Sequence, residues 1–204
     1  MEQGYLGTAC DTCDAEGTGA HDGDWLADYD AQMHKHGYAT PSRCAQAACE
    51  FITDHTQSVL DFGCGTGLSG MALRSAGFTA IDGVDLSPDM LARAETKQVY
   101  RNLSSVGPKG PLPRQLAGYS LITAIDVIGT DTAPISVFDA LMQGMTKGTV
   151  LVLSLNDHAL ADPANEARIN EWLDCGAARL LFRESGPHMP GIGLNSNVYV
   201  FEKN

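Results

Sequence analysis

The apolar positions along the chain follow two different periods. From Asp24 they recur at helical spacing and stop near Gly37, and a second helix is predicted to begin at Thr40-Pro41, with proline in its first turn. The following apolar runs are short and β-branched, and they alternate with helical stretches. They predict strands at 58–62, 79–84, 120–125 and 149–153. This alternation is typical of a parallel sheet with helices on both of its faces.

The last part of the chain returns to longer elements. A helix is predicted from Asp162-Pro163 to Gly176, followed by strands at 179–183 and 197–201. The prolines and glycines between 186 and 191 predict a loop, because they would interrupt a strand ladder. Residues 104–114 predict another loop, and residues 1–23 predict an irregular N-terminal arm ahead of a single domain over 24–204.

Composition narrows the class of partner. The chain has 204 residues, of which 44% are hydrophobic, and this fits one globular domain. Its formal net charge of −12 would repel a phosphate backbone, so we expect no nucleic-acid partner. No apolar run reaches the roughly 20 residues that span a bilayer, and no secretory leader is recognisable, so we expect a cytoplasmic protein without membrane association. The only CxxC, Cys10 to Cys13, lacks a second ligand pair, and we expect no metal site.

A glycine-rich turn follows the first predicted strand, in the segment VLDFGCGTG. Gly63, Gly65 and Gly67 allow a sharp turn and a close approach to a ligand, and amides at the start of the next helix can face a polar group. A dinucleotide fingerprint would need a further glycine where Leu68 stands, which disfavours a nicotinamide or flavin enzyme. The pattern D-x-G-x-G-x-G, which begins at Asp61, is present in full and indicates the other nucleotide-binding class that uses this turn.

A second motif supports the first. The next predicted strand is followed by Asp85, twenty residues beyond Gly65, and then by Leu86-Ser87-Pro88. A carboxylate at a strand tip can accept hydrogen bonds from both hydroxyls of a ribose. The two motifs together therefore favour a site for an adenosine-type ligand.

On these motifs, VLDFGCGTG and IDGVDLSPDML, the sequence resembles the class I methyltransferase superfamily that depends on S-adenosyl-L-methionine (SAM), over roughly residues 24–202. Within it, the chain is most similar to the methyltransferase-like family named for the Williams–Beuren region, on residues 25–30, 37–38, 119–128 and 198–201. The resemblance implies an α/β, Rossmann-like, seven-stranded, mostly parallel sheet with helices on both faces and an antiparallel last strand. It also implies an N-terminal helical lid over residues 24–52 of the methyltransferase domain.

The resemblance further implies a site for SAM. Asp61 and the glycine turn would serve its methionine end, Asp85 its ribose, and Leu86 and Met90 its adenine, while Cys64 fills space inside the turn. An acid that ends the third strand in such enzymes is replaced here by Asn102-Leu103, which implies weaker adenine recognition. The implied cofactor-binding residues are Tyr29, Tyr38, Asp61, Gly63, Cys64, Gly65, Gly67, Asp85, Leu86, Met90, Asn102, Leu103 and Asp126.

Candidate catalytic residues follow the strand at 120–125. Asp126 ends that strand at the edge where parallel sheets present their sites, and it resembles a family position near the sulfonium and the substrate. His158 and His188 are predicted in loops on the substrate side, and either can act as a base near neutral pH. We select Asp126 and His158 as the catalytic candidates.

The predicted activity is methyl transfer from SAM by in-line displacement onto a small-molecule acceptor, for which positioning is the main task. The stretch at 124–127 lacks the Asn-Pro-Pro-Tyr or Asp-Pro-Pro-Tyr segment of amino-group methylases of nucleic acids, which favours a metabolite. The alternative is a catalytically silent SAM-binding sensor or partner subunit. The acceptor, the atom that is methylated and the oligomeric state stay open.

Overall fold

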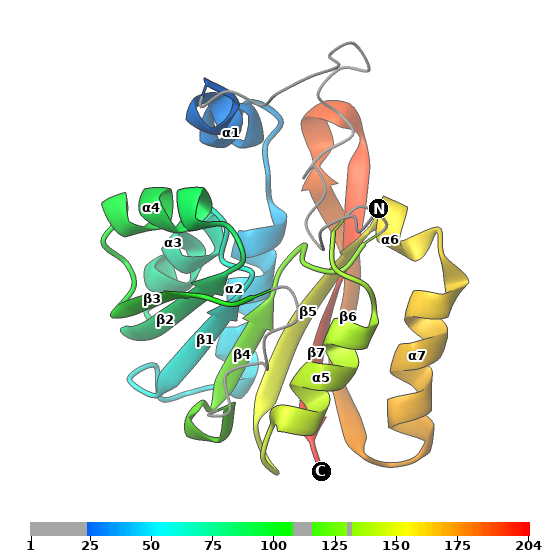
Figure 1. The fold of residues 1–204 in the computed structure, drawn as a ribbon. Helices are drawn as coiled ribbons and strands as arrows, with labels where there is room; N and C mark the ends of the chain where they lie inside the picture. The colour runs from blue at the N-terminus through cyan, green and yellow to red at the C-terminus, as the bar shows by residue number, and fades with distance from the viewer. Residues whose placement is uncertain (1–23, 108–115, 130–131) are drawn as a thin grey trace.

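A seven-stranded sheet forms the centre of the molecule in a computed structural model, which describes residues 24–107, 116–129 and 132–204 (Figure 1). The strands are β1 (Ser58–Phe62), β2 (Ala80–Asp85), β3 (Asn102–Ser105), β4 (Leu121–Ala124), β5 (Val150–Asn156), β6 (Ala178–Met189) and β7 (Leu194–Lys203). Their order is β3-β2-β1-β4-β5-β7-β6. The first five run parallel and β7 runs antiparallel to both of its neighbours. The predicted Rossmann-like fold class is confirmed.

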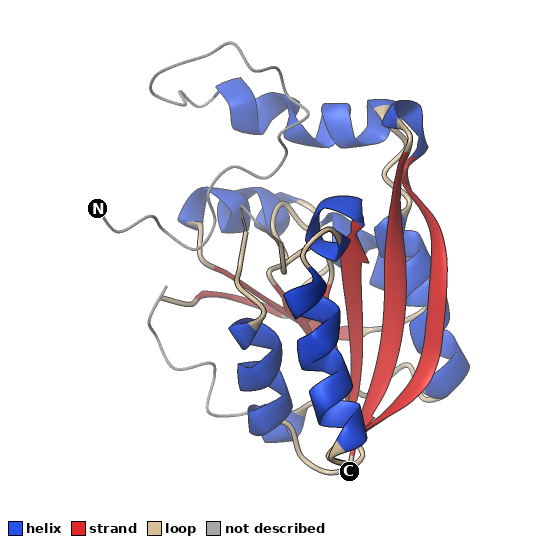
Figure 2. Cartoon of the chain, turned by 90° about the vertical axis from the view of Figure 1, so that its right-hand side faces the viewer, coloured by secondary structure: helices blue, strands red, loops and turns tan. Residues whose placement is uncertain are grey.

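Helices cover both faces of this sheet (Figure 2). Side chains alternate between the faces, so that Val59 belongs to one apolar core and its neighbour Leu60 to the other. None of the described helices has the length and apolar character to cross a membrane. The helices are α1 (Asp24–Lys35), α2 (Thr40–Phe51), α3 (Leu68–Ser75), α4 (Pro88–Thr96), α5 (Ser136–Gly144), α6 (Asp157–Leu160) and α7 (Pro163–Asp174), with 3-10 turns η1 (Leu116–Gly118) and η2 (Pro190–Ile192).

Each helix lies on the face of the sheet whose apolar core contains its buried residues. Helices α2 and α3 supply buried residues to the core that contains Val59, whereas α5 and α7 supply the core that contains Leu60. Helix α2 packs against β5, β6 and β7 and so belongs to the helical layer of the sheet. Of the predicted lid over residues 24–52, only α1 and the link to α2 stand above the carboxyl edge of the strands (Figure 1).

Side chains cap two of the helix starts, whereas no side chain caps α2. Ser87 and Asp162 accept hydrogen bonds from the amides of Met90 and Ala164, which caps α4 and α7. Helix α2 begins at Thr40 as predicted, but Thr40 caps nothing. Its hydroxyl instead forms hydrogen bonds with His188 and Ser196 inside the protein.

The predicted loop at 186–191 is wrong over its first four residues. Strand β6 continues through Gly186 and Pro187 to Met189 and pairs there with the start of β7. Proline is tolerated because β6 is an edge strand, and the pairing shifts register between Pro187 and Met189. The hairpin therefore rises above the other strands and reaches the segment after α1 (Figure 1).

Strand β3 is one of the elements that apolar periodicity did not predict. It has four residues, three of them exposed, and it lies at the other edge of the sheet. A short edge strand buries little, so its sequence carries little apolar pattern. The predicted arm at 1–23, with Cys10 and Cys13, and part of the predicted loop at 104–114 lie outside the described residues.

Replacing Phe138 with alanine tests the packing of the core that contains Leu60. Phe138 is fully buried on α5, and its ring lies 5.5 Å from Phe201 and 6.4 Å from Trp172, centroid to centroid. We expect Phe138→Ala to lower the free energy of unfolding by about 3–5 kcal/mol in urea titrations, because a cavity remains. Met71→Ala, at a side chain 44% exposed, should change it by less than about 0.5 kcal/mol. Equal effects of the two changes would contradict this assignment of the core.

Candidate active site

The glycine turn between β1 and α3 is attached to the neighbouring strand β2. The amides of Gly63 and Cys64 both donate to the carbonyl of Val84, at 2.8 and 3.0 Å. Gly63 has φ of +70°, and a Cβ atom there would lie 2.5 Å from a methyl group of Val127, just after β4. Only glycine fits this position, so the turn is pressed against the end of β4.

The carboxylate of Asp85 faces this turn. One oxygen accepts the amide of Gly65 at 2.8 Å and the other accepts the amide of Ser87 at 2.9 Å. The residue is 4% exposed, and each carboxylate oxygen has a further lone pair beyond these bonds. The two sequence motifs thus meet at one place, at the carboxyl ends of β1 and β2.

Asp61 lies beneath the turn and faces inward. It is fully buried, and its carboxylate accepts hydrogen bonds from the hydroxyls of Ser69 at 2.6 Å, Tyr100 at 2.7 Å and Thr123 at 2.9 Å. Burial raises the pKa of Asp61, and the three hydroxyl donors act in the opposite direction. Asp61 therefore supports the turn from below and contributes no exposed surface beside it.

Tyr100 completes this support, and it was not predicted from the sequence. Its hydroxyl accepts the amide of Gly70 at 3.1 Å while it donates to Asp61. A Cβ atom on Gly70 would lie 2.3 Å from the tyrosine oxygen, and one on Gly83 would lie 3.0 Å from the ring. The glycines at 70 and 83, outside the turn motif, were the available signal that a large side chain enters here. The buried thiol of Cys64, whose pKa is raised by burial, also lies under the turn.

Helix α1 is joined to the turn by an ionic contact that the sequence did not reveal. The carboxylate of Asp30 accepts the hydroxyl of Thr66 at 2.6 Å and pairs with the ammonium of Lys97 at 2.6 Å. Lys97 also donates to the carbonyl of Thr66, again at 2.6 Å. We call Asp30, Thr66 and Lys97 the lid contact, because it holds α1 over the glycine turn.

Asp126 follows β4 in a conformation that few residues adopt. Its φ is +54°, a left-handed value that costs energy outside glycine and often marks functional sites. Tyr38 donates its hydroxyl to Asp126 at 2.6 Å, and Ser154 accepts the amide of Asp126 at 2.8 Å. Burial first, and then the charge of Asp126, hold the pKa of Tyr38 well above its usual value, so Tyr38 remains a donor. Tyr29 lies close enough that its charged form would raise that pKa further.

The structure brings His188, and not His158, to Asp126. The Nδ1 atom of His188 lies 3.4 Å from the carboxylate of Asp126 and 2.9 Å from the hydroxyl of Thr40. His158 is exposed on α6, and the described residues provide no hydrogen bond or ion pair to its side chain. Both histidines lie in regular elements rather than in the predicted loops. The sequence did not reveal the place of His188 because β6 extends beyond the apolar run that predicted it.

The prediction that Asn102-Leu103 ends the third strand is wrong. Asn102 begins β3, at the opposite end from Asp85, and donates to Asp82 at 2.9 Å. Because β2 and β3 are parallel, Ser105 is the residue paired with Asp85 at the site edge. Residues near Ser105, and not Asn102, therefore hold the position that was predicted for adenine recognition.

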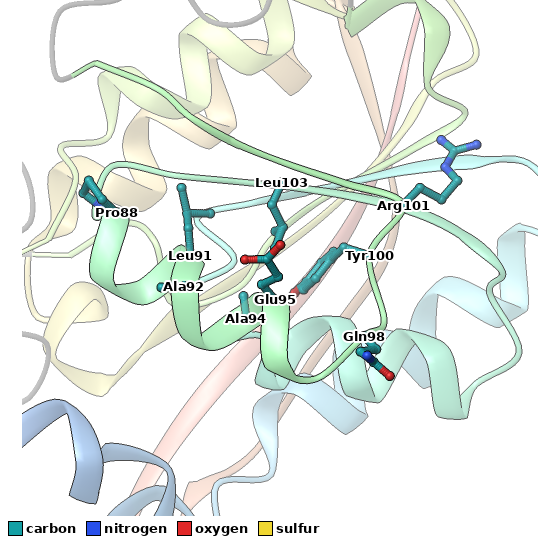
Figure 3. A pocket seen from close by; sticks show the side chains of 9 residues that line it. All are labelled: Pro88, Leu91, Ala92, Ala94, Glu95, Gln98, Tyr100, Arg101 and Leu103. Atoms are coloured by element: carbon teal, nitrogen blue, oxygen red, sulfur yellow. The ribbon is translucent and has the colours of Figure 1, made fainter.

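Leu103 instead lines a cavity of about 410 Å³ between α4 and β3 (Figure 3). Leu91 and Glu95 of α4 form one wall, and Tyr100 closes the end toward the glycine turn. Leu86 and Met90, the other predicted adenine contacts, lie before α4 and in its first turn and are partly exposed.

A family model described as a methyltransferase domain matches residues 29–190. The chain belongs to this methyltransferase family. The human methyltransferase-like protein 27 is 30% identical over 114 residues, which cover 54% of this chain and 46% of that protein. The match therefore spans about half the length of this curated relative.

Solved structures of methyltransferases share the fold. The plantazolicin methyltransferase BpumL, in complex with S-adenosylhomocysteine (SAH), has a TM-score of 0.63 at 11% identity, over 89% of this chain and 90% of that one. The magnesium protoporphyrin IX methyltransferase of Synechocystis PCC 6803, with bound SAM, has a TM-score of 0.58 at 17% identity, over 91% and 87%. The seven-stranded sheet of this chain is thus the fold of these methyltransferases.

Replacing Tyr100 with phenylalanine tests the support beneath the turn. We expect Tyr100→Phe to lower the free energy of unfolding by about 1–2 kcal/mol, because the amide of Gly70 and the buried carboxylate of Asp61 each lose a partner. Tyr119→Phe is the matched control: its hydroxyl donates to Asp82, which keeps Arg101 and Asn102. Chemical unfolding followed by circular dichroism measures both, and a larger loss for the control would refute this role of Tyr100.

Replacing Asp30 with asparagine tests the lid contact. Loss of the charge should raise the amide exchange rate of α1 roughly fivefold, since a partly exposed ion pair contributes about 1 kcal/mol. Asp28→Asn, at an exposed carboxylate of the same helix, should leave that rate unchanged. Hydrogen exchange followed by mass spectrometry provides the comparison. If both variants exchange like the wild type, Asp30 does not hold the lid.

Proposed function

We propose that this methyltransferase transfers the methyl group of SAM to a small molecule at the carboxyl ends of β1, β2 and β4, beside the glycine turn. The observation that carries the proposal is the bond from the amide of Gly65 to Asp85. It places a carboxylate beside a turn whose glycines allow a ligand to approach the protein backbone closely.

The residues present fit SAM as a ligand. Asp85 would hold the ribose hydroxyls, and Leu86 and Met90 would contact the adenine. Tyr29 and Tyr38 come from the lid side, and Asp126 adds a second carboxylate, whose charge favours a cationic sulfur. Bound SAM supplies an activated methyl group; the protein has to hold donor and acceptor in line and exclude water.

A small acceptor is supported by the enclosure of the site. Helix α1, the link to α2 and the β6–β7 hairpin stand over the carboxyl edge of the strands (Figures 1 and 2). The amide of Gly191 donates to the carbonyl of His36, so the hairpin and the link close on each other. A net charge of −12 also opposes a polyanionic substrate.

We also propose the narrower placement in the methyltransferase-like family named for the Williams–Beuren region. The 30% identity to human methyltransferase-like protein 27 supports a relation to methyltransferase-like proteins.

Calorimetric titration with SAM tests the cofactor site. Asp85→Asn should weaken SAM binding by about 10–100-fold, because a neutral amide replaces a charged acceptor for the ribose. Asp89→Asn, at an exposed carboxylate in the first turn of α4, should bind like the wild type. No heat from the wild-type protein at millimolar SAM would end the proposal. Transfer of labelled methyl groups to the small-molecule fraction of a cell extract distinguishes an enzyme from a silent SAM-binding protein.

A further inference from the structure

A buried histidine lies on the acceptor side of the site. The side chain of His188 is 4% exposed, and its ring meets the ring of Tyr38 edge-on at 5.4 Å between centroids. Its backbone carbonyl accepts the amide of Ala39 at 2.8 Å, so the end of β6 is fixed to the link between α1 and α2. The imidazole is thus held by two elements that are far apart in the sequence.

The surroundings determine where its proton lies when the ring is neutral. The carboxylate of Asp126 lies 3.4 Å from Nδ1, and a carboxylate favours a protonated nitrogen over a lone pair facing it. The hydroxyl of Thr40, 2.9 Å from Nδ1, can accept from the same nitrogen because its own hydrogen can go to Ser196 at 2.8 Å. With the proton on Nδ1, the lone pair is on Nε2.

The Nε2 atom is the free end of this arrangement. The described residues provide no hydrogen bond to it, and the only fully enclosed side-chain polar atom without a partner among them is Thr132 Oγ1. Nε2 is therefore an unpartnered nitrogen that is not fully enclosed. A basic nitrogen at this position can take a proton from a bound molecule.

The other charged or titratable groups around His188 do not compete for this role. Arg43 of α2 is engaged by Glu184, by the carbonyl of Pro187 and by Ser196. Burial raises the pKa of Cys44, also on α2, so that its thiol stays neutral. On the hairpin side, Asp157 of α6 accepts the amide of Asn195. Asp126, whose carboxylate also accepts the hydroxyl of Tyr38, remains as the charge that faces the ring.

We propose that Nε2 of His188, oriented by Asp126 and Thr40, accepts the proton of a neutral hydroxyl acceptor during methyl transfer; this inference rests on the proposed function. The acceptor oxygen forms its bond to the methyl carbon as the carbon–sulfur bond breaks, and the sulfur keeps the bonding pair and becomes a neutral thioether. The hydroxyl proton goes to Nε2, and the resulting imidazolium pairs with Asp126 until solvent removes the proton. The product is a methyl ether, which mild alkali does not cleave.

The first test needs no substrate. Nitrogen-15 NMR of histidine-labelled wild-type protein, titrated between pH 5 and pH 9, reports which ring nitrogen carries the proton. We expect neutral His188 to carry it on Nδ1, because the carboxylate of Asp126 and the hydroxyl of Thr40 lie beside that nitrogen. A proton on Nε2 in the neutral ring would overturn the inference.

The second test uses methyl-tritiated SAM and the small-molecule fraction of a cell extract. His188→Asn keeps an N–H group near Thr40 and Asp126 but removes Nε2, and it should lower label transfer at pH 7 by about 100-fold. Its residual rate should rise about tenfold per pH unit, because only the ionised acceptor reacts, whereas the wild-type rate should depend less steeply on pH, because His188 takes the proton of the neutral acceptor. His158→Asn, at the exposed histidine of α6, is the matched control and should match the wild type.

The outcomes separate the two proposals. All proteins should first show equal SAM binding by calorimetry, which establishes that the variants fold. If the wild type binds SAM but transfers no label, the proposed function fails, and the inference fails with it. If label is transferred and His188→Asn has the wild-type rate and pH profile, or the product is labile to mild alkali, only the inference fails.

Discussion

A carboxylate sealed beneath the glycine turn is the interaction on which the rest of the site depends. A buried charge costs several kcal/mol unless it is fully hydrogen-bonded, and Asp61 meets this condition through Ser69, Tyr100 and Thr123. These hydroxyls come from α3, from the segment before β3, and from β4. The carboxylate of Asp61 therefore links these three segments to β1 and supports the glycine turn. Asp85 can then reach the amide of Gly65 from the next strand.

A second carboxylate, that of Asp126, lies in a different environment. Asp126 has a strained backbone and meets groups from the lid link and from the hairpin, namely Tyr38 and His188. The first carboxylate is fully buried at the end of β1, whereas the second lies beneath the link to α2 and the β6–β7 hairpin. The lid contact between Asp30 and Lys97 joins the two regions, because it attaches α1 to the glycine turn while the end of α1 leads to Tyr38.

Parts of the site that are close in the sequence could be predicted, whereas parts that are far apart could not. The glycine turn and Asp85 are twenty residues apart on adjacent strands, and a motif of fixed spacing records that arrangement. Tyr100 and Asp30 belong to no such motif, so their roles appeared only with the contacts. Asn102 was misplaced because a four-residue edge strand has no apolar period from which to count its ends. His158 was chosen over His188 for a similar reason, since the length of β6 was underestimated.

The fold class, the positions of the buried strands and the meeting of the glycine turn with Asp85 follow from the amino-acid sequence. Each of these is recorded in local patterns or short spacings, because strands buried on both faces are short apolar runs, whereas the apolar positions of a helix repeat with its turn. Tertiary structure alone decided which side chains surround Asp126. Tyr38 and Asp126 are 88 positions apart, and Thr40 and His188 are 148 apart. Such pairs depend on strand register and on how the hairpin packs against the lid, and no local pattern specifies either.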